Sequence, residues 1–524
     1  MRKQIVSLAT AGAGLCPSIK SCGLALAAAI GLAASAADLA YAQGLPVVAT
    51  RLPAVESQPF ALPPAEMDLP TSEADQRPID YYELGTNVLD VVEQTSLEKR
   101  LAALEGELKK SKAAEAKKKE EDSLKPVIKP RGRLHTDLNF FTQSAENRAI
   151  YGDVQDGAYF RRARLGFDAK MFEVTQWRLD FEMGSGGVRP SIFDAYVRVT
   201  DLPYINNFQV GHFREPFSLE AQTSSNWLTF IERASNNTFD PSRNWGMMAF
   251  NWSEDERFTW AAGVFREGSD LFGDDIGDSG EWAGTARSTY LLSYDEPSEG
   301  RYFWEVGGSY SYRDPDNRFA NNSASGPPSG AETSIVNYSS RPENNLNEDG
   351  IGRTANLINV SILDANNVQL YGVETSANYG SFNIQSEFIC ALVDRRTRAN
   401  VFYHGAYVQA SYFLTGESRR WERRSGTFGR AEVLEPFFMV NTDHGICTGW
   451  GAWELIARWN YLDLSEGSVG TQYGYVDTTS LGCNWYLNPY VYLQLNYDYA
   501  DVPTGGPATG GNVNVYHARW NMHF

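Results

Sequence analysis

The last twelve residues, Val513–Phe524, read VNVYHARWNMHF and alternate between apolar and polar side chains from Tyr516 onward. A β-strand with this pattern places Trp520 and Phe524 on one face and four polar residues on the other. One face suits lipid or a protein core, and the other suits water. An amphipathic strand of a soluble sandwich has the same pattern, so the rest of the chain must distinguish the two.

The same alternation recurs upstream, from about Arg131. Four successive segments alternate apolar residues with charges of both signs, at 133–140, 162–170, 177–183 and 194–199. Four such charged faces cannot all pack against a dry core, because each unpaired buried charge carries a prohibitive free-energy cost. The opposite face is rich in Trp, Phe, Tyr and Leu, and no helical pattern is present to cover it. A closed barrel in lipid satisfies both faces.

Composition and length agree with a barrel. The chain has 524 residues with 46 Gly, 27 Tyr, 27 Phe and 13 Trp, and it lacks an apolar run of about 20 residues after its N-terminal region. At about 25 residues for each strand with its connection, residues 131–524 accommodate about 16 strands. We therefore predict an all-β protein, a transmembrane antiparallel barrel of about 16 strands with Trp520 and Phe524 facing lipid.

Connections between the strands should alternate between long loops and short turns. Polar stretches at 267–280 and 314–352 predict loops on the outer side of the membrane, and 463–479 is a third polar stretch that follows one strand and precedes another. Turns on the periplasmic side should be short, and Leu487–Pro489 between two aromatic strands is a candidate.

The N-terminal region precedes the barrel. Arg2 and Lys3, the apolar stretch Leu24–Ala34 and the sequence Ala40-Tyr41-Ala42 before Gln43 predict a secretory signal peptide over residues 1–42. Residues 43–95 are rich in proline without hydrophobic periodicity, which predicts a disordered linker.

Residues 96–125 predict a short coiled coil. Leucines at 97, 101, 104 and 108 follow spacings of four, three and four, which form a heptad seam. A helix this short is marginal without a partner. Self-association, a periplasmic partner and a solvated single helix all remain open.

Several classes of function are excluded or unsupported. The formal charge of −19 argues against a nucleic-acid partner. The sequence has no Walker, Rossmann, zinc-type or nucleophile-elbow pattern, and its six histidines share no spacing typical of a metal site. We predict no catalytic residue, metal or cofactor. A barrel enzyme and a purely structural barrel remain alternatives.

Six stretches resemble the phosphate-selective porin O and P family, trimeric channels of the outer membrane. They are 160–167 (FRRARLGF), 194–199 (DAYVRV), 210–219 (VGHFREPFSL), 412–417 (YFLTGE), 451–464 (GAWELIARWNYLDL) and 481–489 (LGCNWYLNP). They span most of residues 131–524. The resemblance implies a 16-stranded barrel in outer-membrane lipid, a homotrimer, and a lumen that is narrowed by an infolded loop and lined with basic side chains.

Arginines on the polar face of the first predicted strands are the candidate residues for binding solutes. Guanidinium groups stay charged and offer paired donors to phosphate or carboxylate, so a series of them can pass an oxyanion along. Alternatively, they form salt bridges with acidic neighbours such as Asp168, Glu182 and Asp194. Arg214 precedes Pro216 at a strand end, and the family pattern places Arg233 and Arg243 in the constriction loop. The candidates are Arg133, Arg162, Arg164, Lys170, Arg178, Arg198, Arg214, Arg233 and Arg243.

The chain also departs from the family. Lys170 is the only lysine after Lys129, whereas the phosphate-selective members use both lysine and arginine clusters, and acidic residues outnumber basic ones from 131 onward. We expect passive uptake of small solutes, with anions such as phosphate passing an arginine-lined lumen. The alternatives are a general-diffusion or weakly cation-preferring porin, or a structural barrel tethered by its coiled coil.

Overall fold

The computed structural model describes residues 100, 104–112, 117, 125–184, 190–267, 282–315, 317–321, 329–344, 354–438, 440–442, 445–447, 449–503 and 505–524. The expected signal peptide and linker lie outside these residues, as do Leu97 and Leu101 of the leucine seam. Residues 104–112 are helical, and Leu104 and Leu108 are exposed. The chain divides into two compact units, Met1–Ser123 and Leu124–Phe524.

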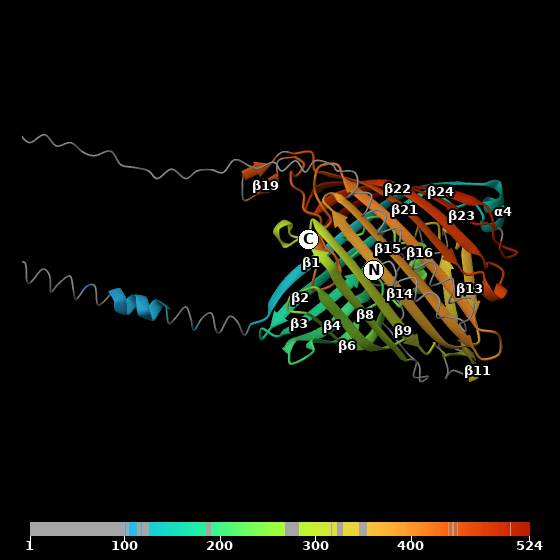
Figure 1. The fold of residues 1–524 in the computed structure, drawn as a ribbon, viewed down its shortest axis with the longest axis horizontal. Helices are drawn as coiled ribbons and strands as arrows, with labels where there is room; N and C mark the ends of the chain where they lie inside the picture. The colour runs from blue at the N-terminus through green and yellow to red at the C-terminus, as the bar shows by residue number, and fades with distance from the viewer. Residues whose placement is uncertain are drawn as a thin grey trace, which may run out of the picture. The chain divides into compact units, whose positions relative to one another are not determined.

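In the second unit, the described residues form one closed barrel of sixteen strands, in which each strand pairs with its neighbours and β1 pairs with β24 (Figure 1). The pairs are antiparallel, as the sequence predicted. The strands are β1 Val127–Gln143, β2 Gly157–Met171, β3 Thr175–Glu182, β4 Ser191–Leu202, β5 Asn206–Arg214, β6 Arg243–Trp252, β7 Phe258–Arg266, β8 Trp282–Tyr294, β9 Tyr302–Arg313, β14 Ala365–Tyr379, β15 Phe382–Arg395, β16 Val401–Phe413, β21 Ala452–Asp463, β22 Tyr475–Asn488, β23 Val491–Asp501 and β24 Asn512–His523.

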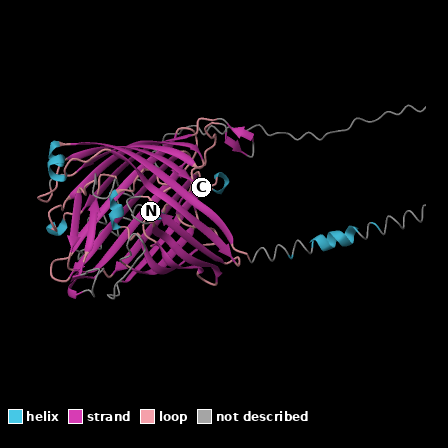
Figure 2. Ribbon diagram, turned by 180° about the vertical axis from the view of Figure 1, so that it is seen from behind, coloured by secondary structure: helices cyan, strands magenta, loops and turns pink. Residues whose placement is uncertain are grey.

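The remaining elements are short and lie in the connections (Figure 2). The helices are α4 Ala145–Tyr151, α5 Leu219–Gln222 and the 3₁₀ turns η1 Ser235–Phe239, η2 Glu296–Ser298 and η3 Glu466–Ser468. The small sheets pair β10 Asn317–Asn321 with β11 Ser329–Ser334, β12 Val336–Ser340 with β13 Ile358–Ile362, β17 Trp421–Glu422 with β18 Thr427–Phe428, and β19 Val440–Thr442 with β20 Gly445–Cys447. No helix within the described ranges is long and apolar enough to span a membrane.

The final strand has the two faces that its sequence predicted. Trp520 and Phe524 are 44% and 63% exposed on the outside of the barrel, whereas Arg519 and Asn521 are 1% and 0% exposed on the inside. An apolar outer face with a polar interior is the arrangement that lipid and an enclosed aqueous lumen require.

The two ends of the barrel differ in their connections. At the end that carries Phe524, most strands are joined by tight turns, such as Gly380–Ser381 between β14 and β15 and Pro489–Tyr490 between β22 and β23. We call this the turn end, and the opposite end the loop end. Short turns of outer-membrane barrels face the periplasm. The expectation that all these turns are short is wrong at one place: residues 414–451 join β16 to β21 at the turn end.

Two segments fold into the lumen. The infolded loop, residues 215–242 between β5 and β6, buries Phe217 and Phe230 to 0% and 1% exposure. Asn484 Nδ2 donates to the carbonyl of Thr229 at 2.9 Å, so the loop reaches the far wall. The turn segment, residues 414–451, begins at the turn end, and its residues Trp421 and Phe428 lie in the lumen, where they pack against Leu219, Leu291 and Phe303. The barrel interior is therefore partly filled.

Candidate functional site

Three cavities follow one another through the barrel. The outer cavity has a volume of about 310 Å³, the central cavity about 640 Å³ and the inner vestibule about 1100 Å³. Arg161, Arg162 and Arg233 line both the outer and the central cavity. Arg198 and Gln222 line both the central cavity and the vestibule. The shared residues place the three cavities next to one another along the infolded loop, and we refer to this succession of cavities as the route.

The central cavity lies between strands β1–β6 and the infolded loop, and it is lined by many arginines. Glu182 and Asp194 are the carboxylates among its lining residues. Of the candidates predicted from the sequence, all except Lys170 line this cavity. Lys170 is exposed near the turn end of β2 and lines none of the three cavities. The ten arginines are Arg131, Arg133, Arg161, Arg162, Arg164, Arg178, Arg198, Arg214, Arg233 and Arg243.

Several of these arginines form the salt bridges that the sequence left open. Arg164 Nε donates to Glu182 at 2.5 Å, and Arg178 Nε donates to Asp168 at 2.6 Å. Arg243 pairs with Asp194 at 2.9 Å, and Arg214 pairs with Asp240 of the infolded loop. Arg243 is the first residue of β6, so its predicted place in the constriction loop is wrong; Arg233 does lie in the infolded loop.

Four other arginines have neutral partners, and none of them has a carboxylate partner within the described residues. The partners are hydroxyl, imidazole, amide and backbone groups, which orient a guanidinium group without neutralising its charge. The central cavity therefore keeps excess positive charge. Arg133 Nη1 donates to Ser225 Oγ at 2.6 Å, Arg162 Nη1 lies 3.5 Å from His135 Nδ1, Arg198 Nη2 donates to Gln209 Oε1 at 2.7 Å, and Arg233 donates to the carbonyls of Glu220 and Thr223 at 2.9 Å each.

Arg161 was missed because strict alternation assigns it to the lipid face. The β1–β2 register shifts between His135 and Thr136, which makes Arg161 an extra residue in β2. Such a bulge turns a side chain that would otherwise point outward. Arg161 and Arg162 both line the central cavity, and Arg161 donates to Glu232 of the infolded loop at 2.8 Å. The sequence did contain a signal of the bulge. Arg161 and Arg162 are adjacent, and strict alternation would place one of them in lipid.

Glu215, which the sequence placed only at a strand end, fixes the root of the infolded loop. Its carboxylate is fully buried. It accepts hydrogen bonds from Arg313 Nη1 at 2.8 Å, Asn244 Nδ2 at 2.6 Å and Thr285 Oγ1 at 2.5 Å. These donors come from β9, β6 and β8. The contacts hold the loop that forms one side of the central cavity.

Glu343, between β12 and β13, places a titratable carboxyl group beside the outer cavity. It accepts hydrogen bonds from Arg458 Nη2 at 2.7 Å and Ser235 Oγ at 3.0 Å. Burial raises the pKa of Glu343 to about 8, and the nearby carboxylates of Asp498 and Glu220 act in the same direction, whereas Arg458 opposes them. The charge beside the outer cavity therefore changes within the pH range of ordinary measurements.

Comparisons with known proteins match the barrel. The family model described as phosphate-selective porin O and P matches residues 128–519. Porin O of Pseudomonas aeruginosa is 26% identical over 389 residues, which cover 70% of this chain and 81% of porin O. An uncharacterized protein of Caulobacter vibrioides is 25% identical over 411 residues, which cover 76% of this chain and 74% of that protein.

Solved structures of outer-membrane proteins are also similar. The anion-selective porin from Comamonas acidovorans matches 76% of this chain and 100% of its own, with 10% identity and a TM-score of 0.46. OmpT of Vibrio cholerae, in its trimer form, matches 76% of this chain and 99% of its own, with 10% identity and a TM-score of 0.45. Because the family match runs from β1 to β24, this chain belongs to the phosphate-selective porin O and P family and forms a porin channel in the outer membrane.

Proposed function

We propose that this porin passes small anions in preference to cations, with phosphate and small carboxylates among its solutes. The observation that supports the proposal most strongly is the set of ten arginines around the central cavity, four of which have neutral partners. Guanidinium groups bind phosphate and carboxylate through paired donors. Several shallow sites along a route let a solute leave as well as enter.

The acidic composition of the chain does not outweigh these arginines. Carboxylates at the wide mouths are screened by salt within about 10 Å at 0.1 M ionic strength. Charges at a narrow, partly desolvated constriction act more strongly on a permeating ion. We expect the reversal potential of the purified protein, measured across a planar bilayer in a KCl gradient, to have the sign of chloride preference. A potential near zero or of cation sign would favour a general-diffusion or cation-preferring porin instead.

Chloride preference should also decrease as pH rises. Glu343 has a pKa of about 8, so its carboxyl group is mostly neutral at pH 6.5 and mostly ionised at pH 9.5. Ionisation places a negative charge beside the outer cavity, which opposes the passage of anions. The wild-type reversal potential should move toward the cation side between these pH values, and Glu343→Gln should abolish most of that movement. An equal movement in Glu343→Gln would assign the effect to other groups.

We further propose that the protein is a homotrimer, with the seam from Leu97 to Leu108 associating in the periplasm. Three linked barrels bring the seams to a high effective concentration, which a short coiled coil requires. Cross-linking in mild detergent should trap trimers of the full chain. Monomers alone, for both the full chain and a version beginning at Arg131, would contradict the proposal. If trimers persist without the seam, the barrel interface is sufficient.

A further inference from the structure

A stripe of aromatic side chains accompanies the arginines along the route. Five rings on β4, β6 and β8 each have a guanidinium group within cation–π distance. The distances from the guanidinium carbon to the ring centroid are 3.4 Å and 3.7 Å for Arg164 and Arg243 over Phe193, 5.7 Å and 5.4 Å for Arg178 and Arg198 over Tyr196, 4.8 Å for Arg198 over Phe250, 5.3 Å for Arg424 over Trp252, and 4.5 Å for Arg423 over Tyr294.

The stripe crosses from one cavity to the next. Phe193 and Tyr196 line the central cavity, whereas Phe250, Trp252 and Tyr294 line the inner vestibule. All five rings are half-buried, so each keeps surface that a solute in the cavity can contact. A ring that served only the packing of the wall would be fully covered.

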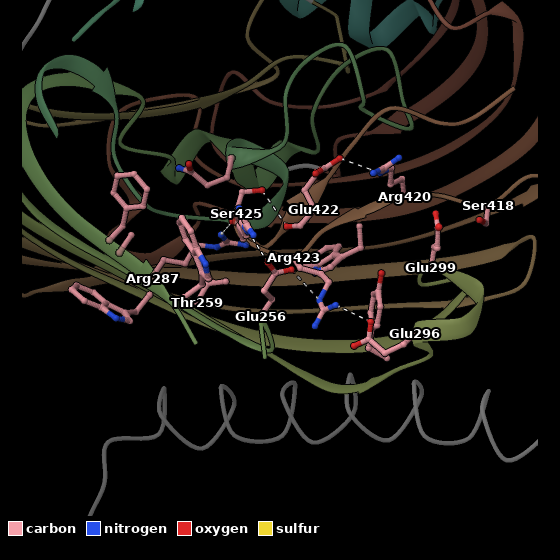
Figure 3. A pocket seen from close by; sticks show the side chains of 18 of the residues that line it. Glu256, Thr259, Arg287, Glu296, Glu299, Ser418, Arg420, Glu422, Arg423 and Ser425 are labelled. Atoms are coloured by element: carbon pink, nitrogen blue, oxygen red, sulfur yellow. Dashed lines mark hydrogen bonds and ion pairs between the residues drawn. The ribbon is translucent and has the colours of Figure 1, made fainter. Parts of the chain in front are cut away.

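In the vestibule, the arginines next to the rings are held by acidic side chains (Figure 3). Arg423 Nη1 donates to Glu296 at 2.9 Å, and Arg424 Nε donates to Glu256 at 2.6 Å. Arg198 differs, because it lines both cavities and its hydrogen bonds go to the neutral side chain of Gln209. The uncompensated charge of the stripe therefore lies at the junction of the two cavities.

We propose that this junction is a subsite for organic anions that carry a planar aromatic group, of which aryl carboxylates are the simplest class. The carboxylate binds the guanidinium group of Arg198, and the aromatic ring stacks on Phe250 or Tyr196. Stacked and edge-to-face ring pairs add affinity beyond the area that they bury. Phosphate and acetate engage only the guanidinium group. The subsite rests on the proposed anion function and adds a preference that charge alone does not produce.

The test compares benzoate with acetate and phosphate as blockers of chloride current through the purified protein in a planar bilayer. In the wild type, benzoate should block at a lower concentration than acetate, although both are monoanions. Phe250→Leu should raise the concentration of benzoate for half block about three- to ten-fold, the factor that corresponds to one ring–ring contact. Block by acetate and by phosphate should stay unchanged. Tyr290→Leu is the matched control, because Tyr290 is a 45% exposed aromatic residue on the outer face of β8.

Equal block by benzoate and acetate in a wild-type channel that prefers chloride would overturn the subsite and leave the anion function standing. A wild-type channel without anion preference would overturn both. If Phe250→Leu does not fold into a barrel, Tyr196→Leu measures the same contact from the central cavity. If block by benzoate is unchanged in the folded variants at both positions, the rings contact the arginines but do not bind the solute. That result would overturn the subsite.

Discussion

Replacing Arg133 and Arg162 together by glutamine is expected to move the reversal potential toward the cation side and to weaken the block of chloride current by phosphate about ten-fold. Neither arginine has a carboxylate partner among the described residues, so the loss of their charge is not offset by the release of an acidic group. A hydrogen bond to a charged group contributes about 1.5–3 kcal/mol, and the lower value corresponds to about ten-fold in affinity.

The control for this variant changes the net charge by the same amount away from the lumen. Arg148 and Arg398 are exposed in connections at the loop end. The double variant Arg148→Gln/Arg398→Gln should behave nearly as the wild type, because salt screens exposed charges. Equal shifts in the two double variants would mean that the overall charge of the protein, rather than the central cavity, sets the selectivity.

Replacing residues 415–451 by a short Gly/Ser turn is expected to raise the single-channel conductance by less than about two-fold, because the replacement widens the inner vestibule that Arg420–Ser425 line, whereas the infolded loop still narrows the central cavity. The replacement is compatible with the barrel, since Phe413 already pairs with Glu454 and the Leu414 amide donates to the Trp453 carbonyl at 2.8 Å. Anion preference should persist, because the ten arginines of the central cavity lie outside the turn segment.

A smaller replacement serves as the control. The hairpin of β19 and β20 belongs to the same turn segment, but its described residues, 440–442 and 445–447, line none of the three cavities, and Ile446 is 65% exposed. Shortening this hairpin alone should leave the conductance unchanged. Unchanged conductance after removal of the whole segment would show that the turn segment does not narrow the route.

The fold was predictable because lipid outside and water inside impose one pattern on every strand. A strand cannot slip by one residue without moving its charges into lipid, so the pattern of Tyr516–Phe524 fixes which face each residue occupies. The same alternation identified most of the arginines that line the central cavity. Arg133, Arg162, Arg164 and Arg198 were assigned to the lumen from alternation alone, and all four line the central cavity.

What the sequence could not supply depends on contacts between distant segments. Whether an arginine is neutralised depends on strand register and on the infolded loop, as the pairs of Arg161 with Glu232 and of Arg214 with Asp240 show. The bulge at Arg161 breaks the alternation on which the prediction relied. No local pattern marks Trp421 and Phe428 of the turn segment as residues that pack inside the lumen. The alternation along β2 assigns Lys170 to the lumen side, but Lys170 lies too near the end of the barrel to line one of the three cavities.

We propose that solutes permeate through the arginine-lined central cavity, which favours anions. Arg198 is the best position to test this proposal, because it lines two successive cavities. In a background without Cys390, Cys447 and Cys483, Arg198→Cys should react with a negatively charged methanethiosulfonate reagent faster than with a positively charged one. Each reaction should lower the single-channel conductance in a discrete step. Complete labelling of the cysteine with no change in conductance, or faster reaction with the cation, would contradict the account.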